Sequence, residues 1–102
     1  MRVIAKPKLV EFMEKFPDAA AALSIFYSRA KCADWTCIED VRSVYPSADA
    51  VKVKSGRTLY VFNIRGNRYR FICAIHFNRK KLFIREFLTH ADYSKQDWKT
   101  RH

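Results

Sequence analysis

Two stretches in the second half of the chain, YVFNIRGNRYRFICAIHF at residues 60–77 and KLFIREFLTHADY at residues 81–93, decide its fold. β-Branched and aromatic residues fill both stretches and favour strands. The pair Gly66-Asn67 interrupts the first and is typical of a two-residue hairpin turn, because glycine supplies the positive φ that the turn needs. Asn78-Arg79-Lys80-Lys81 links the second strand to Leu82. The two stretches therefore predict three strands joined as two consecutive β-hairpins.

The turn also predicts the register of the first hairpin. It pairs Asn63 with Arg70 and Phe62 with Phe71, so the two polar side chains share one face of the sheet. The two phenylalanines then share the opposite face, which we expect to look into the core.

The second hairpin leaves two registers open. If Phe77 lies opposite Leu82, Arg85 joins Arg70 on one face, but Glu86 then falls among apolar neighbours. A slip of one residue reverses these assignments.

A short helix is expected after the last strand. Thr89 followed three residues later by Asp92 resembles a capping box, with aspartate in place of the usual glutamate. Within that helix His90 and Tyr93 are three residues apart and share a face. The residues after it, through His102, are expected to fray, although Trp98 has the character of a docking residue.

The first half of the chain predicts helices that cover the sheet. Apolar residues at helical spacing indicate one helix from Pro7 to Pro17 and a second from Ala19 to Lys31, with Asp18 as its cap. The capping-box pattern Thr36-Cys37-Ile38-Glu39 predicts a third, short helix that presents Ile38, Val41 and Val44 on one side and stops at Pro46. Two further segments are compatible with strands, residues 1–5 and residues 50–54.

These elements define the predicted fold class. It is α+β, with two to three N-terminal helices on a mostly antiparallel, twisted sheet of four to five strands and a short C-terminal helix. The length of 102 residues accommodates one domain, residues 1–102, and 49% hydrophobic residues are enough for its core.

Positive charge is concentrated in the second half of the chain. Residues 1–51 hold seven lysines and arginines against seven acids, whereas residues 52–102 hold thirteen against three, which accounts for the net charge of +10. A half-chain this basic favours a polyanion such as nucleic acid as partner. A surface that only keeps the protein in solution, or a binding surface for an acidic protein, would have the same composition.

Nothing in the sequence indicates a metal, a cofactor or a membrane span. The three cysteines form no CxxC or zinc-type spacing, and the three histidines are scattered. The cysteines are most simply small apolar residues in a reducing cytosol, and the longest apolar run is too short to cross a bilayer. We therefore expect a cytoplasmic protein without a cofactor.

The basic face contains the residue types that RNA cleavage without metal requires. Such a reaction needs a base for the 2′-hydroxyl proton, cations for the crowded phosphate and an acid for the departing 5′ oxygen. Arginine suits the phosphate and histidine suits the proton transfers. Residues of these types lie close together in the sequence: Arg70, Arg85, His90, Tyr93 and Lys95. Each also has an ordinary structural explanation, so the residues alone indicate a basic site with a proton carrier and do not establish catalysis.

The ordered set VFNIRGNRYR and FIREFLTHADY resembles the HigB toxins of bacterial toxin–antitoxin pairs, in the RelE-like group. The resemblance implies a RelE-like fold and a metal-independent endoribonuclease, an mRNA interferase that cleaves messenger RNA on the translating ribosome and arrests growth. It also implies a helix-turn-helix antitoxin of the HigA kind as partner. Ser94 and Asp92 depart from the family pattern, which often has Asp and Glu at these positions.

The resemblance assigns roles by position. Arg70 would stabilise the phosphate, His90 would transfer a proton, and Tyr93 would orient the nucleotide or share the proton transfer. The matched residues Asn63, Asn67 and Arg85 are expected to bind RNA. The basic residues Arg65, Arg68 and Lys95, which the family pattern does not match, are also expected to bind it. The alternative is a noncatalytic, basic RNA-binding regulatory module that uses the same face.

Overall fold

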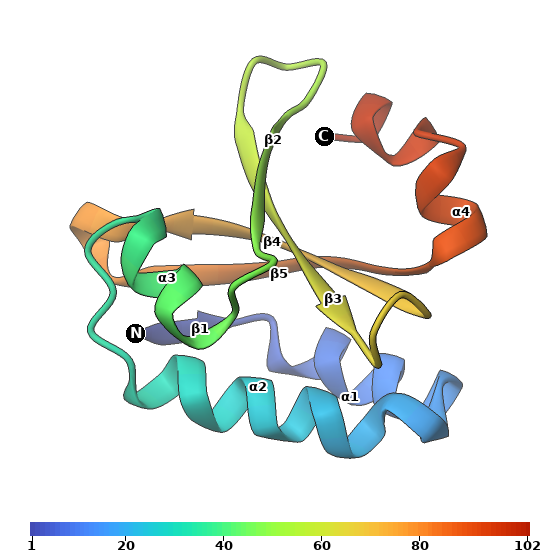
Figure 1. Cartoon of the computed structure of the whole chain (residues 1–102), viewed down its shortest axis with the longest axis horizontal. Coiled ribbons are helices and arrows are strands. Elements are labelled where there is room, and N and C mark those ends of the chain that lie inside the picture. Colours follow the sequence, from blue (N-terminus) through green and yellow to red (C-terminus); the bar gives the residue numbers. More distant parts are fainter.

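A five-stranded sheet forms the centre of the computed structural model, which describes residues 1–102 (Figure 1). Its order is β1-β5-β4-β3-β2, with β1 parallel to β5 and every other pair antiparallel. The predicted α+β class is confirmed. The strands are β1 (Arg2–Ile4), β2 (Asp49–Lys52), β3 (Thr58–Ile64), β4 (Tyr69–His76) and β5 (Lys81–Thr89); the helices are α1 (Lys6–Lys15), α2 (Ala20–Cys32), α3 (Ile38–Val44) and α4 (His90–Ser94), with 3-10 turns η1 (Pro17–Ala19), η2 (Phe77–Arg79) and η3 (Asp97–Thr100).

The helices α1 and α2 cover one face of the sheet. Phe26 of α2 is buried between Phe62 of β3 and Phe71 of β4, with ring centroids 4.7 and 4.9 Å away. Each such buried side chain stabilises the fold by roughly 1.5–3 kcal/mol. The predicted core face of the first hairpin is therefore confirmed.

The helix starts differ in detail from the sequence prediction. Asp18 makes no side-chain cap on α2, because its carboxylate turns to the sheet and accepts hydrogen bonds from Tyr69 and Arg68. At α3, Asp40 takes the place expected for Glu39 and accepts bonds from the backbone N–H and hydroxyl of Thr36, at 2.9 and 2.8 Å.

The third helix presents only part of its expected apolar side. Val41 is fully buried and Ile38 half-buried, but Val44 is 40% exposed. Val44 is the last residue of this seven-residue helix.

The β3–β4 hairpin has the predicted register. Asn63 pairs with Arg70, and Phe62 pairs with Phe71. The turn itself begins one residue earlier than expected, since the positive φ values fall on Arg65 (55°) and Gly66 (66°). A guanidinium nitrogen of Arg65 donates to the carbonyl of Asp18 at 2.8 Å, a contact from the helical layer that supports this conformation.

The pairing of β4 with β5 corrects the prediction for the second hairpin. Leu82 lies opposite Ile75 rather than Phe77, and a bulge leaves Arg85 without a partner on β4. Because of this extra residue, Ile84 and Phe87 both face the helices although they are three positions apart. Glu86 points to the other face, so neither of the two expected registers describes the whole strand.

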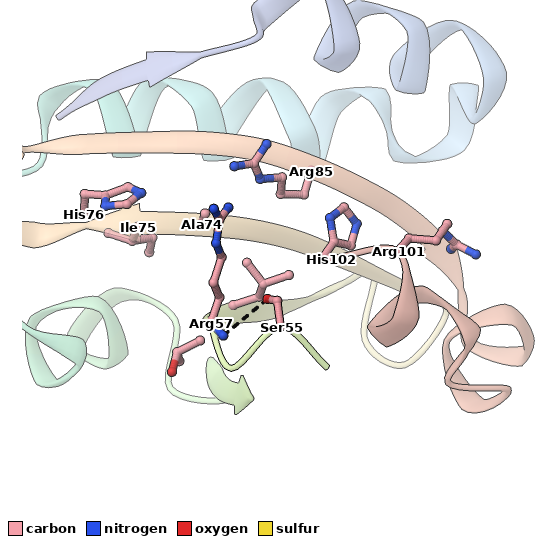
Figure 2. Close-up of a pocket in the computed structure, with 10 residues that line it drawn as sticks. Ser55, Arg57, Ala74, Ile75, His76, Arg85, Arg101 and His102 are labelled. Carbon is pink, nitrogen blue, oxygen red and sulfur yellow. Dashed lines mark hydrogen bonds between the residues drawn. The ribbon is translucent and has the colours of Figure 1, made fainter. Parts of the chain in front are cut away.

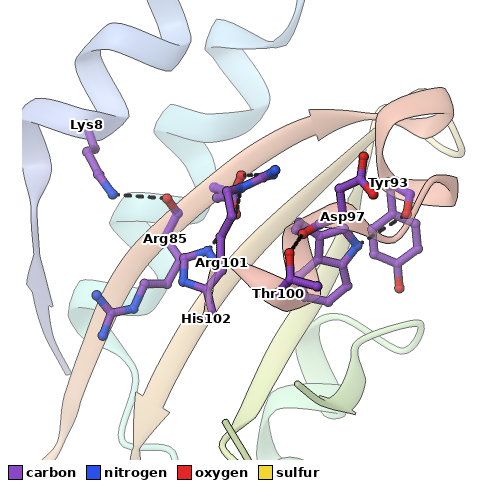
Figure 3. Close-up of polar contacts among 9 residues, drawn as sticks. Lys8, Arg85, Tyr93, Asp97, Thr100, Arg101 and His102 are labelled. Carbon is purple, nitrogen blue, oxygen red and sulfur yellow. Dashed lines mark hydrogen bonds and ion pairs between the residues drawn. The ribbon is translucent and has the colours of Figure 1, made fainter. Parts of the chain in front are cut away.

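The C-terminal segment packs on the face of the sheet that the helices leave open. Trp98 of η3 is 1% exposed and contacts an apolar cluster that includes Val61, Ile72 and Ala74. Beyond it, Arg101 and His102 pair with Glu86, with Arg101 Nη2 2.6 Å from the carboxylate (Figure 3). The expected fraying of these last residues is wrong, because a buried indole and an ion pair hold them.

Glu86 shows the balance of forces in this C-terminal contact. Burial raises the pKa of its carboxyl, but hydrogen bonds from Arg101 and His102 outweigh burial, and the pKa is lowered. The carboxylate is therefore charged at neutral pH and holds the end of the chain against β5.

Candidate active site

A hollow of about 510 Å³ lies over the open face of the sheet beside α4. Asn63 and Arg70, which are cross-strand partners, contribute side chains from β3 and β4. Tyr93 enters from α4, and Arg42 and Asp49 enter from α3 and β2. The hollow thus collects residues that are up to 51 positions apart in the sequence.

Hydrogen bonds with the protein orient the guanidinium of Arg70 in this hollow. Arg70 is only 9% exposed and donates to the carbonyls of Asn67 and Tyr69 at 3.1 and 3.2 Å. A weaker bond reaches Asn67 Oδ1 at 3.4 Å. No acidic side chain forms an ion pair with Arg70. A buried, oriented and unpaired guanidinium is a receptor for an anion such as a phosphate.

Tyr93 forms the neighbouring wall. Its ring stacks on Trp98 at 5.3 Å, and the Arg70 guanidinium lies 5.5 Å from the ring centroid. The indole N–H of Trp98 donates to the Tyr93 carbonyl at 3.2 Å, a contact drawn in Figure 3. Burial raises the pKa of the Tyr93 phenol, Asp49 raises it further, and Arg70 lowers it in part. The phenol is therefore neutral at neutral pH, and its hydroxyl can donate a hydrogen bond.

His90 begins α4, the helix that contributes Tyr93 to this site. The predicted cap is confirmed, because Thr89 Oγ1 accepts a bond from the backbone N–H of Asp92 at 3.2 Å. The backbone N–H of His90 donates to the carbonyl of Arg68 at 3.0 Å, which ties α4 to the β3–β4 turn. The imidazole itself is exposed and does not line the hollow that contains Arg70 and Tyr93.

The residues expected to bind RNA fall into separate groups. Asn63 lines the hollow, and Asn67 supports Arg70 from the turn. Lys95 is exposed outside it and pairs with Asp92 at 3.6 Å. Their contacts with RNA stay a prediction.

Arg65 and Arg68 face the helical layer instead of the hollow. Both bind Asp18, Arg65 through the backbone carbonyl and Arg68 through the carboxylate at 3.1 Å. The hydroxyl of Tyr69 donates to the same carboxylate at 2.8 Å, and this bond is the main cause of the lowered pKa of Asp18. These contacts give both arginines a structural role, and their role in RNA binding stays a prediction.

Arg85 lies apart from Arg70. The bulge in β5 places it at a second hollow on the sheet, which shares no lining residue with the first. The expected gathering of Arg70, Arg85, His90 and Lys95 at one site is therefore only partly realised.

Two residues of the hollow have no distinctive signal in the sequence. Arg42 donates from Nε to the carbonyl of Ala48 at 3.0 Å, and Asp49 starts β2. Both reach the site through the path of the chain from α3 to β2, which the local sequence does not specify.

The structure contains no group of three His, Cys, Asp or Glu side chains placed to hold a metal ion. None of its helices has the length and apolar character needed to span a bilayer.

The mixed sheet, the helices on one face and the basic hollow on the other define a RelE-like α+β protein. Residues 19–96 match the family described as HigB toxin, the RelE-like toxic component of a toxin–antitoxin system. The chain belongs to this family.

Named relatives support the same assignment. The chain is 33% identical over 95 residues to the mRNA interferase HigB of Escherichia coli O6:H1, covering 93% of this chain and 90% of that protein. It is 30% identical over 93 residues to the mRNA interferase toxin HigB of Escherichia coli K12 and to the mRNA interferase HigB of Shigella flexneri, covering 91% of this chain and 88% of each relative.

Proposed function

We propose that this chain is an endoribonuclease toxin that cleaves messenger RNA on the translating ribosome, in the cytoplasm, without a metal ion. A helix-turn-helix antitoxin of the HigA kind neutralises it. The observation that carries the proposal is the buried, unpaired guanidinium of Arg70 beside the protonated phenol of Tyr93, in a chain of the HigB toxin family.

The proposed reaction is an attack of the RNA on itself. The 2′-oxygen loses its proton and forms a bond to the adjacent phosphorus, and the bond from phosphorus to the 5′ oxygen breaks. The products are a 2′,3′-cyclic phosphate and a free 5′-hydroxyl. Arg70 stabilises the extra negative charge on the phosphate, because two parallel N–H groups of its fork match two phosphate oxygens.

Two side chains serve the proton transfers. Tyr93 holds a proton at neutral pH and donates it to the departing 5′ oxygen. His90, the first residue of α4, accepts the proton of the 2′-hydroxyl once RNA lies across the start of this helix. Asn63, adjacent to Arg70 on the sheet, fixes the nucleotide at the scissile phosphate.

Replacement of Arg70 tests the proposal. Arg70→Ala is expected to reduce cleavage at least about 100-fold, the usual cost of removing one group that stabilises transition-state charge. Arg70→Lys keeps the positive charge but lacks the planar guanidinium with its two parallel N–H donors, so it should also lose most activity. The measurement is cleavage of a labelled message by purified protein on translating ribosomes, with and without EDTA, after thermal unfolding has shown that each variant folds.

The control is Arg2→Ala, which removes the same charge from the exposed edge strand β1. It should cleave like the unaltered protein. Full activity of both Arg70 variants would refute the site, and loss of cleavage in EDTA would refute metal independence.

Tyr93→Phe distinguishes the contribution of the Tyr93 hydroxyl from that of the packed ring. The variant keeps the ring on Trp98 and loses only the hydroxyl, so the rate of cleavage should fall about 100-fold or more while stability changes little. An unchanged rate would remove Tyr93 from the chemistry.

One observation favours the noncatalytic alternative. The His90 imidazole stands outside the hollow of Arg70, so the general base is not assembled in the structure without RNA. A regulatory RNA-binding module would show strongly salt-dependent binding and no strand scission in the same ribosome assay.

A further inference from the structure

A second and larger hollow, of about 800 Å³, lies on the same face of the sheet (Figure 2). Leu59 of β3 and Ala74 of β4 supply apolar lining, and Arg57, His76 and Arg85 stand around it. In Figure 2 the side chain of Arg57 extends from the turn before β3 toward Ala74. No aspartate or glutamate lines this hollow.

Two of its cations are free to bind an anion. The guanidinium groups of Arg57 and Arg85 make no ion pair, and neither donates a hydrogen bond within the protein. Arg85 only rests over the ring of Phe83 at 5.5 Å. Arg101, which also reaches the hollow, is already neutralised by Glu86.

The position of the second hollow relates it to the first. Leu59 and Ala74 lie four residues along β3 and β4 from Asn63 and Arg70, and therefore about 13 Å away at the usual rise of a strand. Trp98 belongs to the same apolar cluster as Val61 of the first hollow and Ala74 of the second. A single strand of RNA that follows this face of the sheet would pass both hollows.

We propose that this hollow is a second RNA subsite, in which Arg57 and Arg85 bind backbone phosphates of the same strand at a distance from the cleaved linkage. The inference rests on the proposed function. Arginine forks match phosphate oxygens, and the apolar lining suits a ribose or the face of a base. Single-stranded RNA is favoured over an acidic protein because the hollow continues the face that holds Arg70.

The test is binding of an RNA that cannot be cleaved. A fluorescent 2′-O-methyl ten-nucleotide strand lacks the attacking hydroxyl and is long enough to span both hollows. Anisotropy should show that Arg57→Ala and Arg85→Ala each bind it about tenfold more weakly at low salt. The slope of log affinity against log salt should become shallower by about 0.7 for each phosphate that the variant no longer neutralises. Arg2→Ala is the matched control. It should change the affinity and the salt slope less than either Arg57→Ala or Arg85→Ala does.

A second measurement uses the unaltered protein. Titration with the same strand should shift the amide resonances of residues 57, 76 and 85. Equal affinity and salt slope in the three variants, or no shift at these amides, would overturn the inference. Retained cleavage by Arg70→Ala would overturn the proposed function instead, and because the strand is uncleavable the two failures are distinguishable.

Discussion

At the scale of single residues, the position of the Arg70 guanidinium depends on the turn that precedes its strand. Asn67 binds it twice, through the backbone carbonyl and through Oδ1. The sequence predicts Asn67 as a turn residue and, by resemblance, as an RNA ligand. The structure adds a positioning role, because these hydrogen bonds direct the buried cation into the hollow.

Asn67→Ala tests this positioning role. The substitution removes the Oδ1 bond and leaves the carbonyl bond, so cleavage should fall about tenfold, which corresponds to one hydrogen bond to a charged group. Thermal unfolding should change little. Asn78→Ala, at the exposed β4–β5 connection, is the control and should keep full activity. Equal rates for the two variants would contradict the role of Asn67.

At the scale of elements, η3 determines the shape of the open sheet face. Its Trp98 packs in one apolar cluster with Val61, which lines the first hollow, and with Ala74, which lines the second. The same side chain supports the ring of Tyr93. The segment is short, yet its buried Trp98 supports one wall of the candidate site.

Trp98→Ala is expected to lower the free energy of unfolding by about 3 kcal/mol, because it removes a fully buried aromatic side chain. Urea titration measures this change, and Trp98→Phe should cost less. Cleavage should also decrease, since Tyr93 no longer has its stacking partner. A decrease below about 1 kcal/mol would mean that η3 does not anchor the C-terminal segment.

At the scale of the whole molecule, Asp18 joins the helical layer to the sheet. Its carboxylate accepts bonds from Tyr69 and Arg68, and its carbonyl accepts one from Arg65. The hydroxyl of Tyr69, followed by Arg68, lowers the pKa of Asp18. A carboxyl whose pKa is lower in the folded state stabilises the fold fully above its unfolded pKa of about 3.9, and this contribution disappears as pH falls through the folded value.

Asp18→Asn should therefore destabilise the protein in a pH-dependent way. At pH 7 its melting temperature should lie below that of the unaltered protein, and the difference should shrink as pH falls below the unfolded pKa of about 3.9 toward the lower pKa of the folded carboxyl. Melting curves from about pH 3 to pH 7 measure it. Glu14→Gln changes an exposed carboxylate without such partners and should show no comparable trend. A difference that stays constant across this range would contradict the linkage.

The sequence by itself determined the α+β class, the β3–β4 register, the cap of α4 and the resemblance to HigB toxins. These features depend on local periodicity, turn residues and short spacings, and all of these involve residues that are close together in the sequence. Only the tertiary structure decided the bulge at Arg85, the docking of Trp98 and the meeting of Arg42, Asp49, Arg70 and Tyr93 in one hollow. These depend on packing between distant segments, and alternation along a strand cannot reveal where an extra residue shifts the pairing.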